Sequence, residues 1–239
     1  HGCAGPGNVE RGWAATLGAA GYATLVLDSF GGRGLTEVCS SAWSLTAFQR
    51  LPDAYGALRV LSTHPGIDAR RIALMGFSHG GGLTLGAATV WARERYASGG
   101  RARFRAFLPF YPSCNGTAPE LDAISAPLRI HIGELDDWSP SVPCRERVAA
   151  LRTRGYDADV TVYPGAHHAF DDVGRPVTRL ARVDNGAACR PRARSILGPL
   201  ERPEELVGCL KKGATIGWSR EATDQARDNV RRQLADLLG

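Results

Sequence analysis

Ile72-Ala-Leu-Met-Gly-Phe-Ser-His-Gly-Gly-Gly82 is the stretch that decides the fold of this chain. Its first four residues are apolar and predict a short buried strand, while the apolar, proline-free residues 83–92 behind it predict a helix. Between them stands Gly-x-Ser-x-Gly, and a strand, a sharp turn and a helix are the context in which this motif exposes a nucleophilic serine. We expect glycine at Gly76 and Gly80 because larger side chains would collide where strand and helix close on each other.

The motif alone leaves a second interpretation open, namely a glycine-rich turn between strand and helix with an incidental serine at position 78. In the functional interpretation, the strained turn holds the Ser78 hydroxyl free at the tip of the strand. The backbone N–H of His79 then lies at a helix N-terminus, where it can stabilise an oxyanion. The rest of the chain has to decide between the two.

The chain has 239 residues, of which 44% are hydrophobic and 22% are charged, and this composition fits a single α/β domain over residues 1–239. Strands are expected at 22–27, 72–75, 105–111, 127–132 and 159–163, and helices at 8–20, 49–63, 83–92, 142–154 and 220–238. This alternation predicts a mostly parallel, twisted sheet with helices on both faces. Residues 174–213 lack clear periodicity and are expected to form a long irregular insertion.

Charge and cysteine content narrow the function classes. The net charge is +5, but the basic residues are scattered, so a nucleic-acid partner is not expected. No apolar run approaches the roughly 18 residues of a membrane helix, so a membrane partner is not expected either. No Cys or His spacing suggests zinc, and we expect neither metal nor cofactor. Six cysteines beside one methionine favour a periplasmic or secreted protein with disulfides; the oligomeric state is not predicted.

Two loops supply the partners that a nucleophilic serine needs, a base and an acid that orients the base. Gly133-Glu-Leu-Asp-Asp-Trp-Ser-Pro140 follows one predicted strand, and Tyr163-Pro-Gly-Ala-His-His-Ala-Phe170 follows the last. The chain order Ser, Asp, His is the order of the α/β-hydrolase arrangement. Three such signals at three strand ends favour a serine hydrolase over an incidental serine.

The chain resembles the dienelactone hydrolase family of the α/β hydrolases, from position 1 to about position 170 and in the closing helix. The matching pieces are His-Gly-Cys-Ala-Gly at 1–5, Gly-Phe-Ser-His-Gly-Gly at 76–81, Gly-x-x-Asp at 133–136 and Gly-Ala-His-His-Ala-Phe at 165–170. The resemblance implies an α/β-hydrolase fold and cleavage of small-molecule esters or lactones without a cofactor. The namesake enzymes use a cysteine where this chain has Ser78, which favours general esterase chemistry. Residues 1–5 look like the end of a strand, so the first strands of the fold are expected to be missing.

Carried over onto this sequence, the family motifs imply that Ser78 is the nucleophile, Asp136 the acid and His168 the base. Asp136 stands three residues after the glycine of Gly-x-x-Asp, and His168 stands directly before Ala-Phe. The neighbouring Asp137 is expected to point to solvent, and His167 to be a loop neighbour.

The resemblance also implies that the oxyanion hole combines the backbone N–H groups of Cys3 and His79. Only the backbone of Cys3 is needed, and its side chain can equally be that of a buried structural cysteine. Phe30, Tyr111 and Trp138 follow or end predicted strands at the same edge, so they could line an apolar acyl pocket; packing in the core is the alternative.

Two disulfides are expected from the positions of the cysteines. Cys114 and Cys144 flank the acid strand and its loop, and a bond between them would brace that loop. A bond between Cys189 and Cys209 would close the long insertion. Cys3 and Cys39 both follow early strands, and whether they pair is left open.

Two other functions remain open at this point. A serine peptidase of the prolyl-oligopeptidase type shares the serine and acid motifs, but it normally carries a second domain for which this chain has no room. A binding protein with a silent hydrolase fold usually lacks a triad residue, and none is missing here. The sequence therefore predicts a serine esterase or lactonase that works through an acyl-enzyme.

Overall fold

A four-stranded parallel sheet forms the centre of the protein. The structure is a computed structural model that describes residues 1–41, 44–100 and 102–239. Its order is β1 (Ile72–Phe77), β2 (Phe104–Phe110), β3 (Leu128–Gly133) and β4 (Ala158–Tyr163). Neighbouring strands are parallel throughout, which confirms the predicted α/β class. Since parallel strands end at one edge, the loops that follow β1, β3 and β4 meet there.

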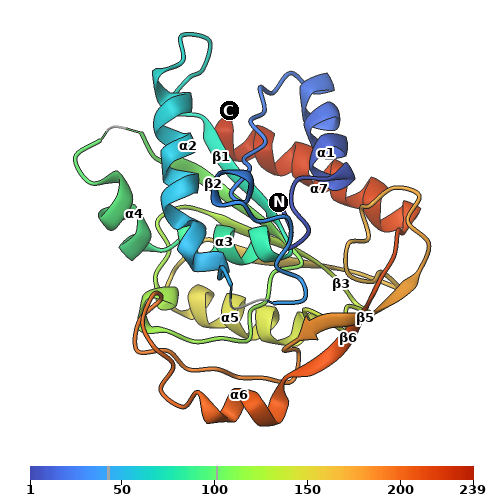
Figure 1. Ribbon diagram of the computed structural model, residues 1–239. Coiled ribbons are helices and arrows are strands. Elements are labelled where there is room, and N and C mark those ends of the chain that lie inside the picture. Colours follow the sequence, from blue (N-terminus) through green and yellow to red (C-terminus); the bar gives the residue numbers. More distant parts are fainter. Residues whose placement is uncertain (42–43, 101) are drawn as a thin grey trace.

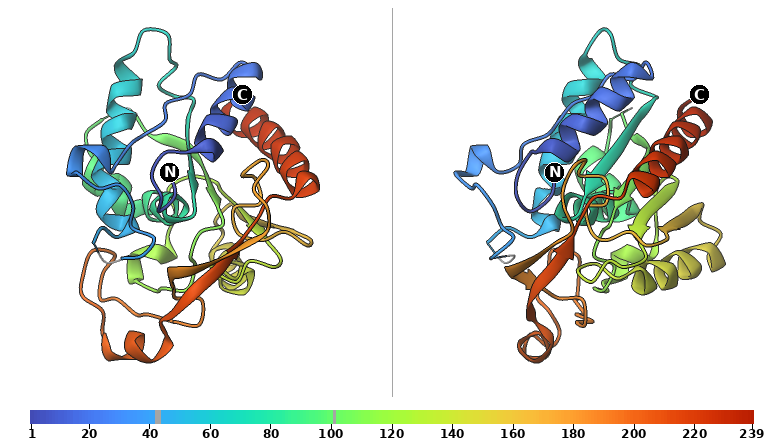
Figure 2. Two further views of the ribbon diagram at one scale, coloured as in Figure 1. Left: turned by 45° about the vertical axis from the view of Figure 1, so that its right-hand side comes forward. Right: turned by 90° about the vertical axis from the view of Figure 1, so that its right-hand side faces the viewer.

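Helices pack on both faces of the sheet, as the alternating pattern predicts. Helix α3 (His79–Ala87) and helix α7 (Arg220–Leu238) both contact β1 and β2, and the right-hand view of Figure 2 shows the sheet between them. Helix α5 (Ser141–Thr153) packs against β3 and β4. The remaining helices of this part are α1 (Asn8–Ala19), α2 (Leu51–Thr63) and α4 (Val90–Ala97), with 3₁₀ turns at Gly31–Arg33, Ala47–Arg50 and Pro119–Asp122.

The helix predicted at 83–92 is in fact two helices. Helix α3 ends at Ala87, and α4 begins at Val90 after Thr89, whose side-chain oxygen accepts a hydrogen bond from Ala92 N. A threonine that caps a new helix in this way interrupts the old one. Residues 83–92 form one apolar run without proline, so the sequence pattern did not show the boundary between the two helices.

Residues 22–27 were predicted to be a strand, and this prediction is wrong. They form no β-ladder with any described residue, and Leu25 and Val26 are 49% and 43% exposed. A cleft of about 690 Å³, with a largely apolar lining, lies between this segment and β1. Strand β1 pairs only with β2 among the described strands, so its other edge is unpaired, and the cleft separates that edge from residues 22–27.

The segment predicted to be irregular contains regular structure. Strands β5 (Thr178–Asn185) and β6 (Lys211–Ile216) form an antiparallel hairpin, and α6 (Glu204–Cys209) lies in the connection between them. Figure 1 shows this hairpin and α6 on the side away from α1 and the C-terminus. A disulfide between Cys189 and Cys209 closes the connection, as expected.

The other cysteines are also paired. Cys114 bonds to Cys144, which confirms the second expected disulfide, and it ties the segment after β2 to helix α5. Cys3 and Cys39, left open by the sequence, form the third disulfide. No described helix has the length and apolar character needed to cross a membrane.

Candidate active site

The turn between β1 and α3 holds Ser78 in an unusual backbone conformation. Its φ is 53° and its ψ is −111°, a region that a non-glycine residue occupies at a cost of about 1–3 kcal/mol. Gly76 allows the close approach, because a Cβ there would lie 2.2 Å from Gly80 O. A Cβ on Gly80 would instead lie 2.6 Å from His1 O. The missing side chain at Gly80 therefore makes room for the first loop of the chain, and not for β1.

Ser78, His168 and Asp136 form one continuous set of hydrogen bonds. Ser78 Oγ lies 2.8 Å from His168 Nε2, and His168 Nδ1 lies 2.8 Å from Asp136 Oδ2. A carboxylate can only accept, so Nδ1 carries the proton and Nε2 is free to accept from the serine hydroxyl. Asp136 and His168 are buried, whereas Ser78 is partly exposed.

The acid loop after β3 is fixed by its own backbone and by the base loop. Asp136 Oδ1 accepts hydrogen bonds from the backbone N–H groups of Trp138 and Ser139, at 2.9 and 2.7 Å, which leaves Oδ2 for the histidine. The loop is joined to the segment after β4 by a bond from Leu135 N to Ala166 O at 2.9 Å. Acid and base are therefore set relative to each other by backbone contacts.

Asp137 lies on the exposed side of the same loop, as predicted, and its carboxylate is also hydrogen-bonded. Its Oδ1 accepts from Thr215 N at 2.7 Å, and its Oδ2 accepts from Thr215 Oγ1 at 2.9 Å. Arg179 lies 3.5 Å from Oδ2. Because Thr215 is in β6 and Arg179 in β5, this carboxylate joins the hairpin to the acid loop. His167 lies beside the base, with Nδ1 3.3 Å from Leu135 O.

The ring of His168 lies between two aromatic rings. The centroid of Tyr111 is 4.6 Å away and that of Trp138 is 4.9 Å away. The Tyr111 hydroxyl donates to Asp171 Oδ1, and Trp13 Nε1 donates to Oδ2 of the same carboxyl. Burial raises the pKa of Asp171 to about 6. Nothing in the spacing of the sequence had pointed to this buried group.

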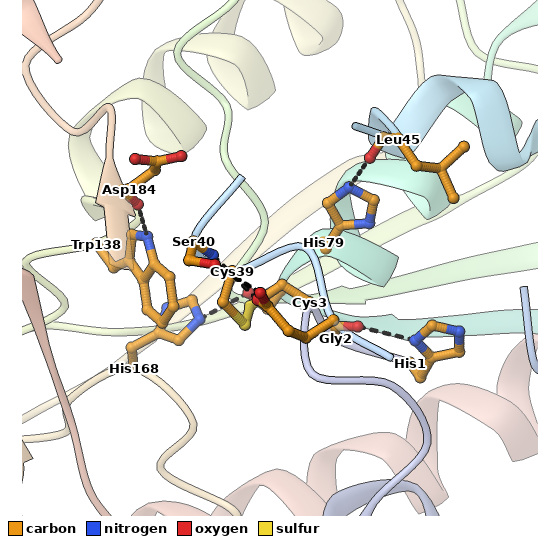
Figure 3. Close-up of a disulfide and its surroundings, with 12 residues drawn as sticks. His1, Gly2, Cys3, Cys39, Ser40, Leu45, His79, Trp138, His168 and Asp184 are labelled. Atoms are coloured by element: carbon orange, nitrogen blue, oxygen red, sulfur yellow. Dashed lines mark hydrogen bonds between the residues drawn. A yellow bond between two sulfur atoms is a disulfide. The ribbon is translucent and has the colours of Figure 1, made fainter. Parts of the chain in front are cut away.

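The first loop of the chain reaches the serine from the other side. A Cβ on Gly2 would lie 3.7 Å from Ser78 Cβ, and Figure 3 shows the disulfide from Cys3 to Cys39 beside His168. Among the described residues, no acceptor is found for the backbone N–H of Cys3 or of His79. The predicted oxyanion donors are therefore both without an acceptor among the described residues, in segments that border the strained serine.

The predicted pocket residues differ in accessibility. Phe30 and Tyr111 are each 1% exposed, so core packing accounts for both, and neither presents a surface to a substrate. Trp138 is partly exposed, and its Nε1 donates to Asp184 O at the end of β5. In the described part of the chain, no group of three His, Cys, Asp or Glu side chains is placed to hold a metal ion.

A sequence model of the dienelactone hydrolase family matches residues 11–195. The chain belongs to the dienelactone hydrolase family. This family match covers the serine turn, the acid loop and the base loop, and it confirms the resemblance seen in the motifs.

The chain spans only part of the length of the individual relatives that it resembles, and little more than half of the curated one. A protein of Bradyrhizobium sp, named as a 2-oxo-3-(5-oxofuran-2-ylidene)propanoate lactonase, is 29% identical over 143 residues, which is 56% of either chain. A crystal structure named as a dienelactone hydrolase of Klebsiella pneumoniae is 18% identical, with a TM-score of 0.52 over 80% of this chain and 62% of that one. A dienelactone hydrolase-like promiscuous phosphotriesterase from metagenomic libraries is 16% identical, with a TM-score of 0.67 over 100% of this chain and 84% of that one. At these identities the two structures show the fold alone.

Proposed function

We propose that this protein is a serine hydrolase that cleaves carboxylic esters or lactones through an acyl-enzyme. The observation that carries the proposal is the hydrogen-bonded series from Ser78 Oγ through His168 to Asp136. Family membership supports the substrate class, and the name of the Bradyrhizobium relative supports lactones within it.

In the proposed mechanism, Ser78 Oγ attacks the substrate carbonyl as its proton passes to His168 Nε2. Asp136 holds the imidazole in the tautomer that accepts this proton and stabilises the resulting imidazolium. The carbonyl oxygen becomes an oxyanion, and the N–H groups of Cys3 and His79 stabilise it. His168 then gives the proton to the departing alkoxide, which remains attached to the acyl group when the substrate is a lactone.

Deacylation uses the same groups in reverse. His168 Nε2 takes a proton from water, the hydroxide attacks the acyl carbon, and the proton returns to Ser78 Oγ as the acid leaves. The partly exposed Trp138 lies against the base and is the residue proposed to contact the acyl group.

Labelling with a fluorophosphonate tests the nucleophile. We expect the reagent to modify Ser78, to abolish hydrolysis of p-nitrophenyl acetate, and to leave Ser78→Ala unlabelled. Labelling of Ser78→Ala at the wild-type rate contradicts the assignment. Comparing an ester and a lactone with a proline-containing peptide amide separates an esterase from a peptidase, and an absence of turnover with all of them supports a binding protein.

We also propose that residues 1–239 form one domain with an insertion at about 174–213. The main cluster of buried apolar side chains supports this, since it runs from Trp13 in α1 to Leu234 in α7. The three disulfides indicate an oxidising compartment, and we propose a periplasmic or secreted location. Mapping of peptides under non-reducing conditions tests this, because six free thiols in the exported protein would contradict it.

A further inference from the structure

Arg50 is a buried charge outside the proposed triad. It ends the 3₁₀ turn Ala47–Arg50 just before α2, and its side chain is 0% exposed. Burial lowers its pKa to about 10, so the guanidinium remains charged at neutral pH. Burying an arginine is costly unless its contacts offset the lost hydration, so the position of those contacts is informative.

One nitrogen of Arg50 makes two hydrogen bonds to two different segments. Nη1 donates to His1 O at 3.0 Å and to His79 Nδ1 at 2.7 Å. The second bond requires that Nδ1 carry no proton, and Leu45 O secures this by accepting from His79 Nε2 at 2.9 Å. Burial, followed by the charge of Arg50, lowers the pKa of His79 to about 4, so this imidazole is neutral at neutral pH.

The two segments are the two halves of the proposed oxyanion hole. His79 supplies one N–H group, and His1 lies two residues before Cys3, which supplies the other. Figure 3 shows His79 close to the loop of His1, Gly2 and Cys3. The halves also touch directly, since a Cβ on Gly80 would come within 2.6 Å of His1 O. Arg50 thus joins two segments that are far apart in the sequence and adjacent at the site.

We propose, on the basis of the proposed function, that Arg50 is a positioning residue that sets the spacing of the two oxyanion-hole donors. It touches neither the triad nor the reacting atoms and acts through His1 and His79. An oxyanion donor is effective only when it lies about 2.7–3.1 Å from the developing charge, so a loosened pair stabilises the transition state less. Substrate binding in the ground state depends much less on this spacing.

A purely structural role for Arg50 makes a different prediction. Its Nε and Nη2 find no partner among the described residues, so two buried donors remain unpaired. Replacing a buried ion by an apolar side chain of similar volume is often neutral or stabilising. If Arg50 served only stability, Arg50→Met would therefore leave kcat unchanged. If it sets the oxyanion donors, kcat falls even in a variant that is as stable as the wild type.

The test compares Arg50→Met with Arg147→Met. Arg147 is a matched control, because it is a largely buried arginine that donates to the backbone carbonyls of Cys114 and Gly116, away from the oxyanion hole. With p-nitrophenyl acetate, we expect Arg50→Met to lower kcat by about tenfold to a hundredfold, part of the loss seen on removing a donor. We expect KM to stay within about threefold, since the lost interaction belongs to the transition state. Arg147→Met should keep kcat within the same threefold of wild type.

Further measurements keep the test independent of folding. Circular dichroism and the melting temperature report whether Arg50→Met is folded. If it is not, Arg50→Ala is assayed with added guanidinium chloride at non-denaturing concentration, which should restore part of kcat in this variant and none in Arg147→Ala. In a His79→Ala background, Arg50→Met should cost less than it does alone, because one of its two contacts is already gone.

The outcomes separate this proposal from the proposed function. A folded Arg50→Met with wild-type kcat, or an Arg50→Ala that guanidinium does not restore, overturns the positioning role while Ser78→Ala remains inactive. If Ser78→Ala retains full activity, the proposed function itself is wrong.

Discussion

Two regions meet at the proposed active site, the carboxyl edge of the parallel sheet and the antiparallel hairpin of β5 and β6. The sheet edge carries Ser78, Asp136 and His168 in loops that follow β1, β3 and β4, and their contacts are buried or partly buried. The hairpin contacts the neighbours of these residues through more exposed bonds, such as those of Asp137 to Thr215.

The difference lies in what holds each region in place. Sheet pairing and a packed core fix the strand ends, so the loops of the triad begin from rigid points. Strand β5 of the hairpin is mostly exposed, and a disulfide closes the long connection between β5 and β6. Besides its bonds to Asp137, the hairpin meets the site where Trp138 Nε1 donates to Asp184 O and where Gly217 N, just after β6, donates to His168 O. We therefore expect chemistry to depend strongly on the sheet edge and weakly on the hairpin.

The largest effect is expected for Asp136→Asn. The amide preserves the shape of the side chain, and its oxygen can still accept from Trp138 N and Ser139 N. Its NH₂ group then faces His168 Nδ1 and favours the tautomer with the proton on Nε2, which cannot take the proton of Ser78. The corresponding change in a serine protease lowers kcat by about 10⁴, and we expect a loss of similar order. Steady-state kinetics with circular dichroism measures this; a near-wild-type kcat in a folded variant contradicts the role of Asp136.

The second prediction removes the disulfide of the hairpin region. Closing a loop of 20 residues stabilises a protein by about 3 kcal/mol in the chain-entropy model, so Cys189→Ala with Cys209→Ala should lower the free energy of unfolding by about that amount. We expect kcat to change by less than about threefold, because neither cysteine contacts the triad. Urea unfolding and ester kinetics are the measurements.

The matched control is the pair Cys114→Ala with Cys144→Ala, which removes a disulfide of similar span beside the acid loop. A similar loss of stability with a larger loss of kcat is expected there. Equal kcat values in the two double variants would show that the acid loop does not depend on its brace.

The third prediction concerns a histidine in the sheet. Burial lowers the pKa of His131 to about 4, and its two nitrogens are occupied by Tyr163 OH at 2.7 Å and Gln233 Oε1 at 3.0 Å. As pH falls below about 6.5, His131 becomes protonated in the unfolded chain but stays neutral in the folded chain. The free energy of unfolding therefore decreases between about pH 6.5 and 4. His79 should contribute to the same loss of stability, because its pKa is also lowered to about 4.

His131→Asn should therefore make the free energy of unfolding fall less steeply with decreasing pH over this window. His64→Asn, at an exposed position after α2, is measured beside it as the control for a histidine outside the core. Denaturant titrations at several pH values measure both slopes. An unchanged slope in His131→Asn contradicts a neutral, buried His131.

The sequence predicted those features that depend on local pattern and on motif. Strands β1 to β4, helix α7 and two of the disulfides follow periodicity and spacing, and the serine turn follows its glycines. The segment 22–27 has the apolar pattern of a buried strand, yet pattern cannot show whether a partner edge lies beside it, and here a cleft does.

Other features depend on tertiary contacts that leave no local trace. Strand β5 is interrupted by exposed arginines at 179 and 182, so its alternation is weak and the hairpin was missed. The three triad side chains were suggested by motifs, and their hydrogen bonds fit that suggestion without testing catalysis. Arg50 and Asp171 could not be found, because a single buried charge among apolar residues has no spacing of its own.

The smallest effect is expected for Asp137→Asn, which tests the boundary between the two regions directly. Asp137 is one residue from the proposed acid, and its carboxylate binds Thr215 and Arg179 of the hairpin rather than His168. Asparagine keeps one oxygen that can accept from Thr215 N, and its NH₂ group can donate to Thr215 Oγ1, so the main loss is an exposed, screened charge opposite Arg179. We expect kcat to change by less than about tenfold, since the bonds that hold Asp136 come from Trp138 N and Ser139 N.

Asp137→Asn is measured beside Asp136→Asn by steady-state kinetics, with circular dichroism to confirm that both variants are folded. Thr215→Val is the matched control, because it removes the hydroxyl that binds Asp137 and keeps the backbone N–H. If the hairpin only supports the loop, Thr215→Val and Asp137→Asn should give similarly small losses. If Asp137→Asn is the inactive variant and Asp136→Asn is near wild type, the acid is Asp137 and the hairpin residues that bind it belong to the catalytic machinery.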